Sequence, residues 1–214
     1  MQAPAQTIAN GQAHHAYFLA CVPEPYRILG LRLRPFSLGH YLLLQKFNCA
    51  YVQDEVEPRH ADLTLGCLVC SMRFAEFIEF IEQKNFLHQV KKWGKRIGVY
   101  QFAEKSALFT EYLKASLTEP DYICTQPSDG NEGDWTHNLK TTLVTRLGYT
   151  DTEALDMPLT KALSEYYKLA ESEGILRLLT PEDIAMAKAN DAALAALEEL
   201  QTAKPEKEDH GATP

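Results

Sequence analysis

The sequence predicts a mainly α-helical protein, a multi-helix bundle that can be divided into two helical subdomains and has at most one short β-hairpin near its N-terminus. Two observations carry this prediction. From Ser37 onward, apolar residues recur every three or four positions in nearly every segment, as they do in amphipathic helices. Only residues 25–36 alternate apolar and polar side chains with the period of a strand.

The strand signal comes first in the chain. Leu29, Leu31 and Leu33 alternate with glycine and arginine until Pro35 ends the pattern. A weak candidate for a partner strand lies at residues 50–56. The sequence therefore allows one short hairpin at the start of the folded region.

Five helices are expected in the rest of the N-terminal domain, residues 23–118. Their apolar stripes predict helices over residues 38–47, 61–72, 73–83, 85–98 and 102–117. Ser37 stands where a side-chain oxygen can accept a hydrogen bond from a free amide of the first helix. Cys67 and Cys70 lie in the second helix between Leu, Gly and Val, so we expect buried thiols that pack as small apolar groups.

A linker separates this domain from a second helical domain. Residues 119–134 combine proline, glycine, aspartate and serine, which favour loops. Residues 135–202 then form the C-terminal domain, with helices expected over residues 135–147, 159–174 and 180–200. We expect residues 1–22 to be a flexible leader and residues 203–214 to be a disordered tail.

A sharp corner is expected between the first two helices of the C-terminal domain. Gly148 follows the last apolar position of the helix, where a residue without a Cβ tolerates a positive φ. Thr150 and Glu153 form a capping box, in which each side chain bonds the backbone amide of the other residue. Pro158 ends the short turn. The pattern indicates a rigid joint between two helices.

Charge is distributed unevenly along the chain. Residues 1–130 carry 13 acidic and 13 basic residues, whereas residues 131–214 carry 16 acidic and 8 basic residues. The second part therefore holds the whole net charge of −8. Such a surface repels phosphate backbones and suits a basic protein partner.

The motifs of most enzyme classes are missing from the sequence. It contains no phosphate-binding glycine loop, no dinucleotide fingerprint and no nucleophile elbow. None of its seven histidines forms an HxxxH or HExxH pair, and Cys67 and Cys70 have no second pair to complete a zinc site. We expect no catalytic residue, no cofactor and no metal. No run of 18 apolar residues predicts a membrane span.

One basic cluster, Lys91 to Arg96, surrounds Trp93. An aromatic ring among cations can stack a nucleic-acid base. However, Trp93 shares an apolar stripe with Phe86 and Val90, and cations near a helix C-terminus complement the helix dipole. We therefore expect the cluster to be structural.

Residues 135–175 resemble the tail assembly chaperones encoded in bacteriophage and prophage tail operons. Three short motifs carry the resemblance: Leu147-Gly148, then Thr150-Asp151-Thr152-Glu153, then Met157 before a helix. The matching stretch covers about a fifth of the chain. The segments 31–47 and 62–72 also resemble parts of helical proteins from such operons.

This resemblance implies a protein without enzymatic activity, working in the bacterial cytoplasm. It would keep the helical tape-measure protein, and tail-tube subunits, soluble until the tail polymerises. The expected contact residues are Trp135, Leu139, Tyr149, Met157, Tyr167, Met186, Leu197 and Leu200. Three alternatives stay open: a neck or tail-completion component of the virion, a DNA-packaging or regulatory protein that binds through Lys91–Arg96, and a thiol or metal enzyme.

Overall fold

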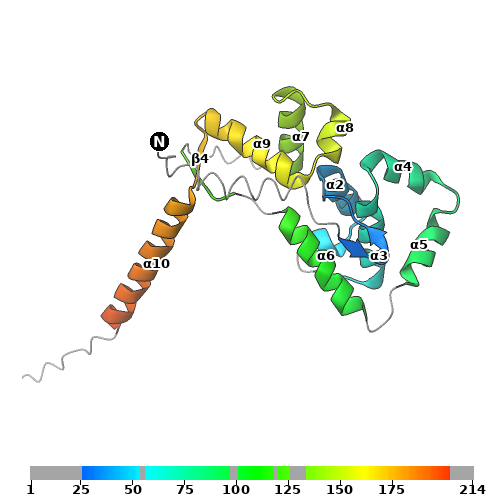
Figure 1. The fold of residues 1–214 in the computed structure, drawn as a ribbon, viewed down its shortest axis with the longest axis horizontal. Helices are drawn as coiled ribbons and strands as arrows, with labels where there is room; N and C mark the ends of the chain where they lie inside the picture. Colours follow the sequence, from blue (N-terminus) through cyan, green and yellow to red (C-terminus); the bar gives the residue numbers. More distant parts are fainter. Residues whose placement is uncertain (1–25, 54–55, 97–100, 118–119, 126–133, 203–214) are drawn as a thin grey trace, which may run out of the picture.

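The computed structural model describes residues 26–53, 56–96, 101–117, 120–125 and 134–202. These residues are mainly helical, which confirms the predicted fold class (Figure 1). The predicted leader, residues 1–22, and the predicted tail, residues 203–214, lie outside the described residues. The elements are, in order, β1 (Arg27–Ile28), β2 (Leu31–Arg32), α2 (Leu38–Lys46), the 3₁₀ turn η1 (Ala50–Val52), α3 (His60–Ser71), α4 (Phe74–Glu82), α5 (Phe86–Gly94), α6 (Phe102–Ser116), β3 (Tyr122–Cys124), α7 (Trp135–Thr145), α8 (Asp151–Asp156), α9 (Leu159–Ser172), β4 (Leu176–Leu178) and α10 (Pro181–Thr202).

The N-terminal hairpin is tighter than the alternation of leucines predicted. β1 and β2 pair antiparallel, with Ile28 opposite Leu31, so the loop between them is only Leu29 and Gly30. Both loop residues have a positive φ, 55° and 76°, as a two-residue hairpin turn of this hand requires. The predicted partner strand at residues 50–56 is wrong, because Ala50–Val52 forms the turn η1.

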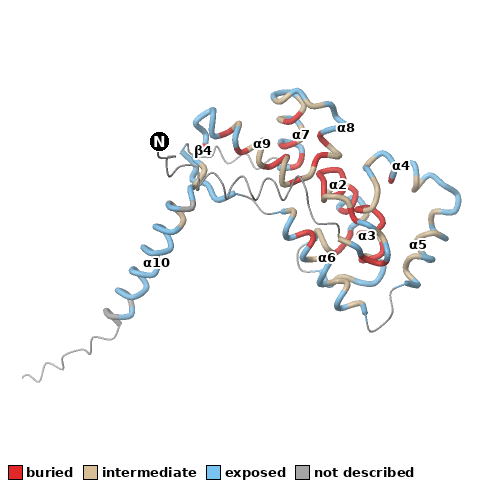
Figure 2. The backbone as a smooth tube through the Cα atoms, in the orientation of Figure 1, coloured by how far each residue is buried: buried red, intermediate tan, exposed pale blue. Residues whose placement is uncertain are grey.

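The core is centred on α3, which is buried along most of its length (Figure 2). α3 packs against α2, α5 and α6. It meets α6 at Gly66, where an added Cβ would lie 2.6 Å from Cζ of Phe109. Glycine is therefore required at this position for the two helices to come so near. The predicted burial of Cys67 and Cys70 is confirmed.

The helices α7, α8 and α9 join this core rather than stand apart from it. α8 packs on α2, and the Leu159 amide donates a 2.7 Å hydrogen bond to the Phe36 carbonyl. A second link runs from the Phe74 amide to Oδ1 of Asp156, at 2.9 Å. One hydrophobic cluster includes residues from both predicted domains. The proposed division into domains stays a prediction, with these contacts joining its two halves.

The corner between α7 and α9 has the predicted construction. Gly148 has a φ of 77°, and the Tyr149 amide beyond it donates to the Leu143 carbonyl. At the start of α8, the Thr150 hydroxyl accepts from the Glu153 amide at 3.2 Å, and the Glu153 carboxylate accepts from the Thr150 amide at 2.9 Å. The hydrogen bonds that the Thr150 amide and hydroxyl donate to this carboxylate lower the pKa of Glu153. The capping box makes the corner a structural joint.

Replacing Thr150 by alanine is expected to lower the free energy of unfolding by about 1 kcal/mol, because the Glu153 amide loses its acceptor. Urea denaturation followed by circular dichroism measures the change. Thr152→Ala is the matched control, since Thr152 is exposed within the same short helix. An equal loss in both variants would show that the cap does not stabilise the corner.

A second two-stranded sheet joins segments that lie far apart in the sequence. β3 pairs antiparallel with β4, so that Tyr122 lies opposite Leu178 and Cys124 opposite Leu176. β3 falls within residues 119–134, for which the sequence predicts only a linker. The sheet holds β3 beside the segment that follows α9. From β4 the chain continues into α10.

Candidate protein-binding surface

Exposed apolar side chains concentrate on the β3–β4 pair and on α10. We call the β3–β4 pair the ribbon and α10 the arm. Six of the eleven large hydrophobic residues that are exposed in the described residues belong to, or directly adjoin, these two elements: Tyr122, Ile123, Ile175, Met186, Leu194 and Leu197. The other five are scattered over the rest of the structure. A concentration of this kind is typical of a protein-binding surface.

The two faces of the ribbon have different roles. Tyr122 packs its ring 5.0 Å from that of Tyr167 in α9, and Leu176 is buried on the same face. Because side chains alternate along a strand, Ile123 and Arg177, which lie opposite each other, point to the other face. Ile123 is therefore exposed on the face of the ribbon that Arg177 shares.

Arg177 also fixes the start of the arm. Its guanidinium donates a 3.2 Å hydrogen bond to Oδ1 of Asp183, in the first turn of α10. The other oxygen of Asp183 accepts from the Thr180 amide at 3.0 Å, and the Thr180 hydroxyl accepts from the Asp183 amide. Hydrogen bonds from Thr180, and then the charge of Arg177, lower the pKa of Asp183. The capping box of Thr180 and Asp183, and the ion pair from Arg177 of the ribbon, thus hold the first turn of the arm.

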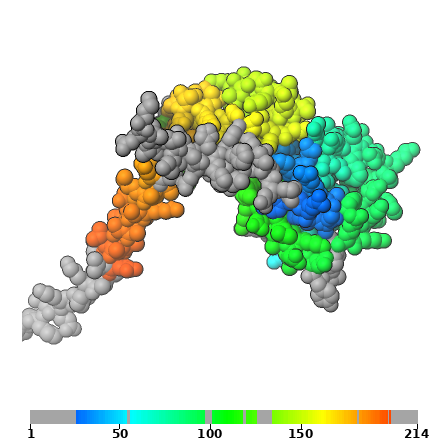
Figure 3. Space-filling model, in the orientation of Figure 1, coloured from blue at the N-terminus to red at the C-terminus, as the bar shows by residue number. Residues whose placement is uncertain are grey.

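Beyond its first turn the arm is exposed on all sides from Ala185 to Leu197. Met186 is 65% exposed, Leu194 58% and Leu197 54%. Figures 1 and 3 show α10 projecting from the ribbon, away from the body formed by α2 to α9. A helix in water derives most of its stability from the packing of an apolar face. An exposed helix with these side chains is therefore suited to pack against another molecule.

The residues predicted from sequence as contacts separate into two groups. Leu139, Met157 and Tyr167 are buried in the core of the chain itself, so the candidate surface does not include them. Half-buried Tyr149 and partly exposed Trp135 both lie on the body of the molecule, and the ring of Trp135 is 5.0 Å from that of Tyr41.

Of the predicted contact residues, only the three in α10, namely Met186, Leu197 and Leu200, belong to the arm. Met186 and Leu197 are exposed there, whereas the side chain of Leu200 lies outside the described residues. Ile123 and Ile175 were not predicted. Ile123 stands in a stretch otherwise rich in polar residues, which is a signal that could have found it, whereas Ile175 begins an apolar run and has no such signal.

The basic cluster Lys91–Arg96, at the end of α5, makes internal contacts through Arg96. The Arg96 guanidinium lies 3.7 Å over the ring of Trp93 and donates to the Leu29 carbonyl at 3.5 Å. Trp93 is half-buried against the core, as its apolar stripe predicts. Lys91, Lys92 and Lys95 are exposed. The tryptophan ring is thus covered by an arginine of its own cluster.

The buried thiols are held in their neutral form. Burial raises the pKa of Cys67 to about 12 and that of Cys49 to about 11, and it raises the pKa of Cys70 as well. A thiol is a strong nucleophile and metal ligand only as the thiolate. These cysteines therefore lack the lowered pKa that would support a thiol enzyme. Among the described residues, no group of His, Cys, Asp and Glu side chains could hold a metal ion.

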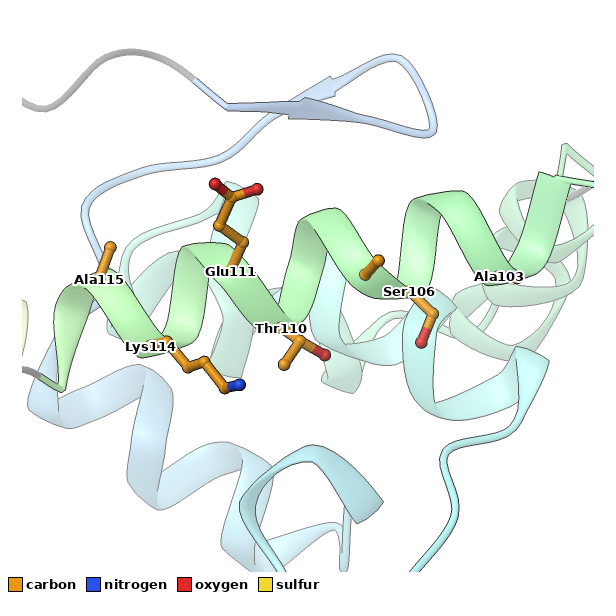
Figure 4. A pocket seen from close by; sticks show the side chains of 7 residues that line it. Ala103, Ser106, Thr110, Glu111, Lys114 and Ala115 are labelled. Atoms are coloured by element: carbon orange, nitrogen blue, oxygen red, sulfur yellow. The ribbon is translucent and has the colours of Figure 1, made fainter.

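A cavity of about 740 Å³ opens along α6. Figure 4 shows Ala103, Ser106, Thr110, Glu111, Lys114 and Ala115 along this single helix. Most of the lining side chains are small, and Glu111 and Lys114 are the charged ones among them. The described residues that line this cavity all lie on one helix, so they supply no opposed set of polar groups to orient a small molecule.

The fold and the surface together define a mainly helical protein with an exposed apolar arm. The chain matches no protein-family model, no curated protein and no solved structure. Among the described residues, no helix has the length and apolar character that crossing a bilayer requires.

Proposed function

We propose that this chain is a non-enzymatic assembly protein of the phage-tail type, a chaperone that binds the tape-measure protein through apolar helix faces. The single observation that carries the proposal is the gathering of exposed apolar residues on the ribbon and the arm. The resemblance of residues 135–175 to tail assembly chaperones supplies the biological setting. The bacterial cytoplasm is the compartment in which this binding would occur.

The architecture supports such a role physically. A long tape-measure helix exposes an apolar stripe until it is packed inside the tail, and it aggregates if that stripe stays uncovered. An arm that projects from a compact body can lie along such a stripe and cover it. The acidic C-terminal half gives this chain a net negative charge, which opposes its self-association.

Co-expression with a long helical tape-measure protein encoded beside this gene tests the proposal. We expect the tape-measure protein to move from the insoluble to the soluble fraction and to co-purify with this chain. An unrelated acidic helical protein of similar size is the control for a general effect of charge. A tape-measure protein that stays insoluble, or that is equally soluble with the control, would contradict the proposal.

Purified tails provide the second readout. A chaperone is released before assembly ends, so the chain should be absent from particles that contain the tape-measure protein. Stoichiometric retention in washed particles would instead identify a structural component of the virion.

A further inference from the structure

We infer that the free edge of the ribbon, along β3, binds an extended segment of another protein as a third, antiparallel strand. Such a segment would place a β-branched apolar side chain beside Ile123 and a cation beside Asp121. Backbone groups make most of this contact, so the inference does not depend on the apolar helix faces of the proposed function.

Every second residue of β3 pairs its backbone with β4. At one end of the ribbon, the Thr125 amide donates to the Ile175 carbonyl at 3.0 Å. At the other end, the Leu179 amide donates to the Asp121 carbonyl at 2.9 Å. Hydrogen-bonded positions alternate along an antiparallel pair, so Ile123 is the position between these two that also faces β4.

The two remaining residues of β3 leave their backbone groups unpaired. The N–H and C=O of Tyr122 and of Cys124 point away from β4, because alternate residues of a strand direct these groups to opposite edges. All of β3 is exposed, and within the described residues no hydrogen bond reaches these four groups. They are two donors and two acceptors at the spacing that an extended backbone complements.

The opposite edge of the ribbon is closed. The Leu178 amide points away from β3 and donates to Oε1 of Glu171 at 3.1 Å. Native proteins block exposed strand edges with charged side chains, with proline or with a covering segment. Glu171 does so for β4, whereas β3 reads Tyr-Ile-Cys and contains neither a charged residue nor a proline. The ribbon therefore offers one edge to an added strand.

The side chains on the outer face of the ribbon specify the added segment. Directly opposite residues of neighbouring strands have Cβ atoms about 4.5–5.5 Å apart, so the central residue of the segment lies beside exposed Ile123, where valine or isoleucine packs well. Asp121 lies on the same face, is exposed and forms no ion pair with a described residue. A lysine or arginine two residues after the central one would face it. Pro120 has no N–H, so backbone pairing ends at Tyr122 on this side.

A second copy of this chain fits this description less well. In an antiparallel pair of β3 strands centred on Ile123, Asp121 would lie opposite Thr125 instead of a cation. Each chain also carries a net charge of −8, which opposes the approach of two copies. Charge therefore favours a segment from another protein.

A synthetic pentapeptide, acetylated at its N-terminus and amidated at its C-terminus, tests the inference against the full chain. Its sequence, Thr-Thr-Val-Thr-Lys, places valine opposite Ile123 and lysine opposite Asp121 in the antiparallel register. Four hydrogen bonds give a weak contact, so binding is measured by NMR from the amide shifts of Tyr122, Ile123 and Cys124 at millimolar peptide. We expect saturable shifts at these amides, and slower hydrogen exchange at Tyr122 and Cys124.

Two altered peptides separate backbone pairing from side-chain contact. Methylation of the amide nitrogens of the second and fourth residues removes two of the four hydrogen bonds and keeps every side chain. We expect this peptide to bind about 10-fold more weakly. Replacing its lysine by glutamate in the unmethylated peptide should weaken binding by about 2-fold or more, because a carboxylate then faces Asp121.

The variant Cys124→Pro locates the contact on the β3 edge. Proline removes an N–H that makes no bond to β4, so the ribbon is kept and only its free edge changes. We expect it to weaken binding of the first peptide by about 5-fold or more. Cys124→Ser keeps the amide and is the matched control, with binding equal to that of the wild type. Slow exchange of the Ile123 amide shows that the ribbon stays paired in both variants.

Four results would overturn the inference: no saturable shift with the first peptide, equal binding of the methylated peptide, unchanged binding by Cys124→Pro, or slow exchange of the Tyr122 and Cys124 amides before any peptide is added. The last result would mean that the chain itself, or a second copy, already covers the edge. The proposed function is judged separately, because co-expression measures the solubility of the tape-measure protein and not the state of these amides.

Discussion

Phe109→Ala is expected to lower the free energy of unfolding by about 3–5 kcal/mol, because it leaves a cavity at the contact between α3 and α6. The ring of Phe109 is 0% exposed and lies 4.8 Å from the ring of Tyr51 in an edge-to-face arrangement. Its tip fills the space above Gly66, where no Cβ stands. A helix backbone lines one side of the site, so neighbouring side chains cannot collapse fully into the cavity.

Leu108→Ala is the matched control for this prediction. Leu108 precedes Phe109 on the same helix but is 37% exposed, so its truncation is expected to cost less than about 1 kcal/mol. Guanidinium denaturation of both variants measures the difference. Similar losses for the two residues would mean that α6 does not contribute its inner face to the core.

The helices and their ends could be predicted because the physical causes lie within a few residues. The cap at Ser37, the positive φ of Gly148 and the capping box of Thr150 each depend on side chains no more than three positions away. Amphipathic periodicity likewise records which side of a helix will be buried. Both signals are local, and the structure confirms them.

The ribbon could not be predicted because its cause is a long-range pairing. Each strand has three residues, too few to show a period of two, and β3 stands in a stretch whose proline and glycine content favours a loop. The strand gains its partner only after α7, α8 and α9 have brought Leu176–Leu178 beside it. Pairings of this kind depend on the fold as a whole.

The candidate surface was predicted only in part for a related reason. Periodicity shows that Leu139 and Met186 lie on apolar faces, but it does not show whether another part of the chain covers each face. In the structure, the core covers Leu139 and Met157, whereas α10 extends away from it. The arm's exposure therefore follows from the position of the ribbon, which the sequence did not reveal.

His40 is a buried histidine that joins two helices of the core. The Ser37 amide donates to Nδ1 at 3.1 Å, so Nε2 carries the proton and donates to the Met72 carbonyl at 2.7 Å. Burial lowers the pKa of His40 from 6.5 to about 4, although the hydrogen bond to Met72 and the charge of Asp156 raise it. The imidazole is therefore neutral in the folded protein at any pH well above 4.

Acidification is expected to destabilise the protein through this histidine before most carboxylates titrate. Below pH 6.5 the unfolded chain binds a proton at His40, whereas the folded chain does so only near pH 4. The stabilising contribution is therefore complete above pH 6.5 and is lost as the pH falls toward 4. The loss due to this one group amounts to about 3 kcal/mol, since each unit of pKa difference corresponds to 1.36 kcal/mol.

Denaturation at a series of pH values between 7 and 4 measures this effect in the wild type and in His40→Asn. Asparagine can still accept from the Ser37 amide but does not titrate. We expect the variant to be less stable at pH 7, because it loses the bond to Met72, and to show a flatter dependence of unfolding free energy on pH. His88→Asn, at an exposed position of α5, should keep the wild-type slope. Equal slopes for the wild type and His40→Asn would mean that the two helices are not joined by a neutral imidazole.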